Sequence, residues 1–298
     1  MTPVALALVL AAAVLHATWN YWAKKAGGGL PFVYLVGIVI NLGYIPVIAL
    51  YVWLNRPSLG AAALVAIFVS GVLKTGYSLF LQRGYRTGDF SLIYPLARGT
   101  GPLLSALGAI LLYAERPSAL ALSGAVLIVV GIFWIAGGHR WLRLASTQGP
   151  TAGIAADAAR KAVWYGLVSG VFIAAYTLWD KRGVAFLMIA PVLFDAGTAF
   201  TQLVLLAPFA WKRRAEVARE WRVHRKNALI MAAASPLSYI LVLTAMTFTP
   251  VSYVAPAREV SILIGMFFGA RFLNETDAKR RVWAGLCIVF GIVALALG

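Results

Sequence analysis

Apolar residues occur along this chain in long runs, and short segments that contain Lys, Arg, Gly or Pro separate these runs. Each run is close to the ~20 residues that an α-helix needs to cross a bilayer, so it predicts a spanning helix. We therefore predict an all-α membrane protein with ten transmembrane helices. The predicted spans cover residues 4–23, 31–54, 60–82, 89–113, 117–136, 162–180, 185–211, 227–248, 251–270 and 282–297.

The composition supports a membrane protein, because 61% of the residues are hydrophobic and only 12% are charged. An ordinary soluble domain has about 25% charged residues. The net charge of +16 would suit a nucleic-acid binder, but the basic residues stand at the ends of the spans and not on a polar face with interleaved aromatics. We expect a lipid bilayer and a small-molecule substrate as partners, no nucleic acid, and a monomer or homodimer.

The basic residues also predict an orientation, since loops rich in Lys and Arg stay in the cytoplasm. The connections after the odd-numbered spans hold nineteen of them, with the largest group in 212–226, whereas the opposite side holds four. We expect a multi-pass protein of the plasma membrane, the inner membrane of a bacterium, with both termini outside the cytoplasm.

Motifs for cofactor or metal chemistry are absent from the sequence. Cys287 is the only cysteine, which excludes an internal disulfide and a cysteine-based metal cluster. There is no nucleotide-binding glycine loop and no nucleophile–base arrangement. We predict a protein without a cofactor that is not an enzyme.

The second half of the chain echoes the first at a spacing near 160 residues. Trp19 and Asn20 match Trp179 and Asp180, Arg98 matches Arg258, and Glu115 matches Glu275; Tyr77 matches Tyr239 two residues out of phase. Five helices in each half require the two copies to enter the membrane from opposite sides. We predict a 5+5 inverted-topology repeat, with the first repeat at 1–137, a linker at 138–161 and the second repeat at 162–298.

Two segments resemble those of a known family, namely "HATWN" at the end of the first span and "YRTGDFSLIYPLARGTGPLLSALGAILLYAERPS" across the third to fifth spans. With the repeated plan after residue 162, the chain resembles the ten-helix EamA-type carriers of the drug/metabolite transporter superfamily. The resemblance implies a 5+5 inverted repeat and transport of small metabolites, often amino acids and frequently outward. In many relatives, however, the basic loop lies between the second and third helices and the termini are inside.

Five ionisable residues fall near the middle of their predicted spans, namely Lys74, Arg98, Asp195, Arg258 and Glu259. A charge that faces lipid costs at least ~2.5–3.5 kcal/mol, so these side chains should face the bundle interior. One interpretation is structural, with the arginines held by Glu259, Asp195 or backbone carbonyls. The other is functional, because a guanidinium suits a substrate carboxylate bidentately and three cations face two anions.

Other polar and aromatic residues extend this candidate site. Lys74 and Tyr77 share one helical face, Tyr94 lies one turn before Arg98, and Tyr239 is the repeat partner of Tyr77. We predict these residues, with Arg98 and Arg258, as the substrate-binding set. Pro95, Pro102, Gly99 and Gly101 surround Arg98, and Pro250 and Pro256 precede Arg258; they predict either broken helices that free backbone groups or kinks with tight glycine packing.

His16, Trp19 and Asn20 share one face near the end of the first span, and Tyr176, Trp179 and Asp180 repeat that face in the second half. Inversion would place the two faces at opposite membrane surfaces, which suits a pair of gates. Interfacial Trp is also ordinary in membrane proteins, so an anchoring role is the alternative. We predict Trp19, Asn20, Tyr176, Trp179 and Asp180 as gate residues.

We predict secondary active transport of a small carboxylate-bearing, amino-acid-like solute by alternating access, with export or exchange as its direction. Without a nucleotide site, the energy must come from an ion gradient or from exchange. Glu259 and Asp195, and more weakly His16, are the candidate coupling residues, because a mid-membrane carboxylate is the usual proton carrier. The alternatives are a membrane enzyme or carrier for phosphate-bearing lipids or sugars, and a scaffold protein.

Overall fold

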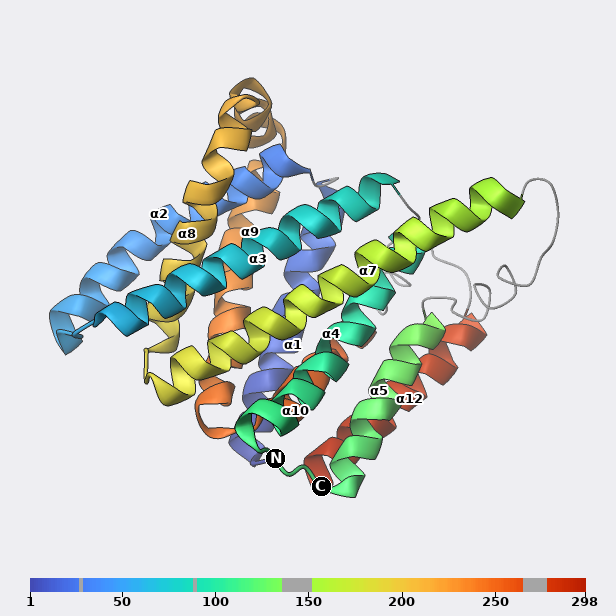
Figure 1. Cartoon of the computed structure of the whole chain (residues 1–298). Helices are drawn as coiled ribbons and strands as arrows, with labels where there is room; N and C mark the ends of the chain where they lie inside the picture. The colour runs from blue at the N-terminus through green and yellow to red at the C-terminus, as the bar shows by residue number, and fades with distance from the viewer. Residues whose placement is uncertain (27–28, 88–89, 136–151, 265–277) are drawn as a thin grey trace. The chain divides into compact units, whose positions relative to one another are not determined.

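The computed structural model describes residues 1–26, 29–87, 90–135, 152–264 and 278–298. The described residues form α-helices and one π-helical segment, and no β-strand occurs among them. The helices are α1 (Pro3–Lys25), α2 (Leu30–Asn55), α3 (Ala61–Thr87), α4 (Phe90–Tyr113), α5 (Ala119–Ile135), α7 (Ala152–Lys181), η1 (Arg182–Phe186), α8 (Pro191–Trp211), α9 (Arg214–Phe248), α10 (Val251–Ala257) and α12 (Ala278–Leu297). Figure 1 shows these helices, coloured from blue at the N-terminus to red at the C-terminus. The all-α prediction with ten helices is confirmed.

Length and apolarity support membrane insertion. Five described helices have a segment long and apolar enough to span a bilayer, in α1, α2, α3, α8 and α9, and two shorter apolar helices lie at 119–134 and 285–297. Large apolar side chains also point outward, including Ile45 (64% exposed) and Leu111 (82% exposed). Apolar exposure along many helices, as here, is uncommon in soluble proteins and suits side chains that face lipid.

Proline and local sequence explain where the observed helices differ from the predicted spans. The predicted span 185–211 is divided: the helical run of α7 continues through η1 to Phe186, and α8 begins only at Pro191. Because a proline disfavours helical backbone in the residue before it, Ala190 is extended, with φ −54° and ψ 131°. The predicted 251–270 span breaks after Ala257, and helix resumes at 260.

Two segments expected to be connections are also helical. Residues 152–161 of the predicted linker form the start of α7. The predicted basic loop at 212–226 lies mostly in α9, which bends at His224, where φ is −120° and ψ is 21°. Its Ala, Glu and Arg residues favour a helix, and Arg213 forms an ion pair with Glu216 one turn on.

The chain divides into two compact units, and each draws helices from both predicted repeats. Unit 1 comprises Met1–Leu6, Gly76–Leu178 and Thr249–Gly298, and unit 2 comprises Ala7–Thr75 and Trp179–Phe248. Three helices, α1, α3 and α7, pass from one unit into the other.

In unit 1, α5 packs along α12, its counterpart in the second repeat (Figure 1). A Cβ on Gly124 would lie 2.5 Å from the carbonyl oxygen of Gly291, and one on Gly291 would lie 2.6 Å from that of Gly124. Only glycine permits such close backbone contact. The Met1 ammonium group donates to the carbonyl of Ala296 at 3.2 Å, so the two termini lie together. Their placement outside the cytoplasm stays a prediction.

In unit 2, α2 packs against α8 and α9, and its contact with α9 has a core that includes Phe32, Leu35 and Met231. Glycines bring α3 close to α8. A Cβ on Gly71 would lie 2.5 Å from the Cβ of Thr201, and one on Gly197 would lie 2.5 Å from Cγ2 of Ile67. This approach brings Lys74 of α3 to Thr198 of α8.

We therefore expect Gly71→Ala to lower the thermal unfolding midpoint of the detergent-solubilised protein, because overpacking costs about 1–3 kcal/mol. Gly43→Ala in α2 is the matched control: a Cβ there meets nothing within 4 Å, so alanine should be neutral or stabilising. Equal midpoints for the two variants would contradict the close crossing of α3 and α8.

Candidate functional site

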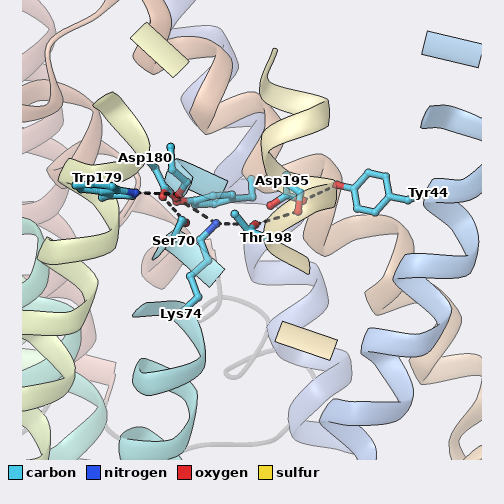
Figure 2. Close-up of polar contacts among 9 residues, drawn as sticks. Tyr44, Ser70, Lys74, Trp179, Asp180, Asp195 and Thr198 are labelled. Carbon is cyan, nitrogen blue, oxygen red and sulfur yellow. Dashed lines mark hydrogen bonds and ion pairs between the residues drawn. The ribbon is translucent and has the colours of Figure 1, made fainter. Parts of the chain in front are cut away.

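The first cluster of buried polar residues lies in unit 2 and centres on Lys74, near the middle of α3. The Lys74 ammonium group lies 3.1 Å from Oδ2 of Asp180 and donates to the hydroxyl of Thr198 at 3.1 Å. It also lies over the ring of Tyr239, 4.3 Å from the centroid. Lys74 thereby joins α3 to the end of α7 and to α8 (Figure 2).

Asp180 is fully buried and receives three donors. Besides Lys74, the hydroxyl of Ser70 donates to Oδ1 at 2.5 Å, and the hydroxyl of Tyr239 donates to Oδ2 at 2.5 Å. Three donors to one carboxylate provide hydrogen-bond partners for both of its oxygens. The cost of burying the pair is thus offset by direct contacts from α3 and α9.

Asp195 has a different environment in the same unit. Its carboxylate accepts a hydrogen bond from the hydroxyl of Tyr44 at 2.5 Å, and it forms no salt bridge with any residue that the structure describes. Thr198 connects it indirectly to Lys74, since the Thr198 hydroxyl donates to the Asp195 carbonyl at 2.9 Å. Figure 2 shows the row from Asp180 through Thr198 to Tyr44. We call Tyr44, Ser70, Lys74, Asp180, Asp195, Thr198 and Tyr239 the Lys74 cluster.

The turn after α7 helps to position Asp180. The η1 segment continues the helix, and a Cβ on Gly183 would lie 2.2 Å from Cε2 of Phe194, so the turn packs closely on that ring. Lys181 is also buried, and its ammonium group donates to the carbonyl of Met246 at 2.6 Å. These contacts keep Asp180 within the helical core of unit 2.

The second cluster lies in unit 1 and has Glu259 between two arginines. Nε of Arg98 lies 2.9 Å from Oε2 of Glu259, and Nε of Arg258 lies 3.6 Å from Oε1. Arg98 also donates to the hydroxyl of Ser261 at 3.2 Å. Glu259 is fully buried, and the two arginines are 6% and 4% exposed. We call Arg98, Arg258, Glu259 and Ser261 the Arg98 cluster; it joins α4 of the first repeat to the second repeat.

The backbone differs on the two sides of this cluster. On the second-repeat side, α10 ends at Ala257, and the Glu259, Ser261 and Ile262 amides bond three residues back, as in Glu259 N–H to the Pro256 carbonyl at 3.0 Å. On the first-repeat side, α4 continues without interruption past Pro95 and Pro102. Gly101 instead permits packing, because a Cβ there would lie 2.6 Å from Cγ2 of Ile173. A broken helix is therefore found at Arg258 and tight glycine packing at Arg98.

Glu115 fixes the start of α10. Its two carboxylate oxygens accept the backbone N–H groups of Val251 and Ser252 at 2.8 and 2.9 Å. A carboxylate stabilises a helix N-terminus, where amides lack partners within the helix. Its repeat partner, Glu275, lies outside the described residues.

The five predicted mid-span charges occur in both units. Lys74 and Asp195 belong to unit 2, whereas Arg98, Arg258 and Glu259 belong to unit 1. Sequence reasoning missed Ser70, Thr198, Tyr44 and Ser261. It also placed Asp180 at the end of a span; because η1 extends that helix, Asp180 is instead a buried acidic residue, like Asp195 and Glu259.

The predicted gate residues lie in different surroundings. His16 and Trp19 share a face as expected, with ring centroids 4.8 Å apart, and Asn20 donates to the His16 carbonyl at 2.7 Å. In the second half, Trp179 donates to the carbonyl of Ala66 at 2.9 Å. The gate role stays a prediction.

The remaining tyrosines also divide between the units. The ring of Tyr176 lies 5.9 Å from that of Tyr77 within unit 1, and Tyr239 belongs to unit 2. The Tyr94 side chain lies outside what the structure describes. The substrate-binding and coupling roles of all these residues stay predictions.

Comparisons with known proteins place the chain in context. The profile of the EamA-like transporter family matches residues 3–137 and again residues 160–297, so nearly the whole chain is covered by two copies. One solved crystal structure of a protein is similar with a TM-score of 0.72 at 15% sequence identity, over 98% of each chain, which shows a shared fold. Among curated proteins, no sequence matches this one.

Proposed function

Since this chain belongs to the EamA-like transporter family, whose members are membrane transporters of small molecules, we propose that it carries small carboxylate-bearing solutes by secondary active transport. Amino-acid-like solutes are the favoured class. The observation that carries this proposal is the Arg98 cluster, in which one fully buried carboxylate lies between two guanidinium groups.

Arg98 is the proposed binding group for the solute carboxylate. A solute carboxylate can replace Glu259 as the partner of Arg98. The Arg98 guanidinium group then keeps an anionic partner throughout the exchange. Guanidinium groups hold carboxylates through two parallel hydrogen bonds, which favours this class over neutral solutes. Arg258 adjoins Glu259 and can retain it when Arg98 binds the solute.

The repeats supply a reason for the exchange to be linked to movement. Arg98 belongs to the first repeat, and Glu259 to the second. In transporters with inverted repeats, alternating access moves one repeat or bundle against the other. An ion pair that joins the repeats can form and separate in that cycle.

Asp195 is the proposed proton carrier. It is a buried carboxyl group whose described polar partner is the Tyr44 hydroxyl, whereas Asp180 and Glu259 have cations within 3.1 and 2.9 Å. Carboxyl groups within spanning helices serve as proton carriers in many transporters. Glu259, and then His16, are the next candidates. Lys74 forms an ion pair with Asp180, and Tyr239 donates a hydrogen bond to it, which suits a structural role for the ion pair of Lys74 and Asp180.

Binding can be tested with the purified protein and a thermal-shift screen of amino acids, organic acids, amines and sugar phosphates. For the best carboxylate, Arg98→Ala should weaken binding by about 30-fold or more, the loss expected when a buried charged partner is removed. Arg98→Lys should restore it only in part, because the two-pronged geometry is lost. The exposed Arg116→Ala in the same unit is the control.

Unchanged affinity in both Arg98→Ala and Arg258→Ala would contradict a binding role for the cluster. Stabilisation by sugar phosphates without any response to carboxylates would favour the phosphate-bearing substrate class.

Coupling can be tested by solute uptake into sealed proteoliposomes under an imposed pH gradient. We expect the gradient to drive accumulation by the unmodified protein. Asp195→Asn should retain solute exchange and lose accumulation, because an amide cannot carry the proton; Glu216→Gln, at an exposed carboxylate, is the matched control. If uptake by the unmodified protein does not depend on the pH gradient, proton coupling is ruled out, and facilitated exchange is the remaining mechanism.

A further inference from the structure

A basic surface in unit 2 has no place in the proposed transport site. The segment Trp211–Lys226 contains seven basic residues, most of them exposed, and only two acidic ones. The acids are engaged within the segment: Glu216 pairs with Arg213, and Glu220 lies 3.8 Å from His224. Arg222 and Arg225 are exposed and form no ion pair within the part of the chain that the structure describes. The surface therefore has positive charge available for an external anion.

Exposed apolar side chains lie in the same segment. Trp211 is 70% exposed, Trp221 is 43% exposed and Val223 is 63% exposed, and Arg214 lies over the Trp211 ring at 5.7 Å. A helix that combines large apolar side chains with arginines matches a helix at the bilayer interface, where Trp occupies the headgroup level. The bend at His224 separates this first part of α9 from its spanning part.

A second group of cations adjoins this segment. The ammonium groups of Lys25, at the end of α1, and Lys226 both face the ring of Trp22, at 5.3 and 5.7 Å from its centroid. Asn227 fixes the arrangement by donating to the Trp22 carbonyl at 3.1 Å. Two like charges beside one ring repel each other, and an anion held between them would offset that repulsion.

We propose that Trp211–Lys226, with Lys25, binds the phosphate headgroup of anionic phospholipids. Arg222 and Arg225 supply guanidinium groups for phosphate oxygens, and Lys25 and Lys226 supply point charges on either side of Trp22. The exposed indoles of Trp211 and Trp221 would lie against the acyl-chain boundary. This combination suits a lipid better than a soluble phosphate, which would gain nothing from the exposed rings.

Native mass spectrometry of the purified full-length protein, with phosphatidylglycerol or phosphatidylcholine added, tests the proposal. Phosphatidylglycerol should bind more tightly than phosphatidylcholine. Arg222→Gln/Arg225→Gln should weaken phosphatidylglycerol binding by about tenfold or more, given the attraction of each basic residue to anionic lipid, and Lys226→Gln by a smaller factor. Arg116→Gln/Lys161→Gln removes the same charge at other exposed positions and should change little.

Each variant is first checked for an unchanged elution profile and thermal midpoint, so that a loss of fold is not taken for a loss of lipid. Equal binding of the two lipids, or full binding by Arg222→Gln/Arg225→Gln, would overturn the proposal. An equal loss in the control variant would attribute the effect to net charge alone. Displacement of the lipid by an equal concentration of glycerol phosphate would show a site for soluble phosphate and would likewise overturn it.

Discussion

The cost of placing a charge among apolar side chains in a bilayer governs this structure. An unpartnered charge costs at least ~2.5–3.5 kcal/mol there, and the described helices expose many large apolar side chains. Lys74, Asp180, Arg98 and Glu259 are all buried, and each lies against a group of opposite charge. Because the partners come from different segments of the chain, every such pair also holds those segments together.

Close helix contacts make these pairings possible. In unit 2, Gly71 and Gly197 allow α3 and α8 to approach, and Lys74 lies one turn beyond Gly71 on α3. In unit 1, Gly101 lets α4 pack on Ile173, while Glu115 fixes the start of α10 just before Arg258. Small residues and a helix-capping carboxylate thus place charged side chains within ion-pairing distance, which an apolar helix surface alone would not do.

The fold was largely readable from the sequence, because a helix of fixed rise must contain about 20 apolar residues to span a bilayer. The breaks were less readable. The division before Pro191 follows from proline geometry, but the continuation of α7 into η1 has no comparable signal. Because of that continuation, Asp180 lies in the buried core and not at the helix end where it was expected. The repeat did not predict the contacts of Asp180. Asn20, the repeat partner of Asp180, donates to the backbone carbonyl of His16, whereas Asp180 forms an ion pair with Lys74. Equivalent positions in a repeat need not share chemistry, and partners depend on which helices meet in space.

The dependence of buried charges on their partners can be measured with the pair Lys74 and Asp180. The thermal unfolding midpoint would be compared for Lys74→Met, Asp180→Asn and the double variant in one detergent. Removing one partner of a buried ion pair costs about 3–5 kcal/mol, so each single variant should be strongly destabilised. The double variant, which leaves no charge unpartnered, should lose much less than the sum of the two. Additive losses, or a single variant as stable as the unmodified protein, would contradict the account.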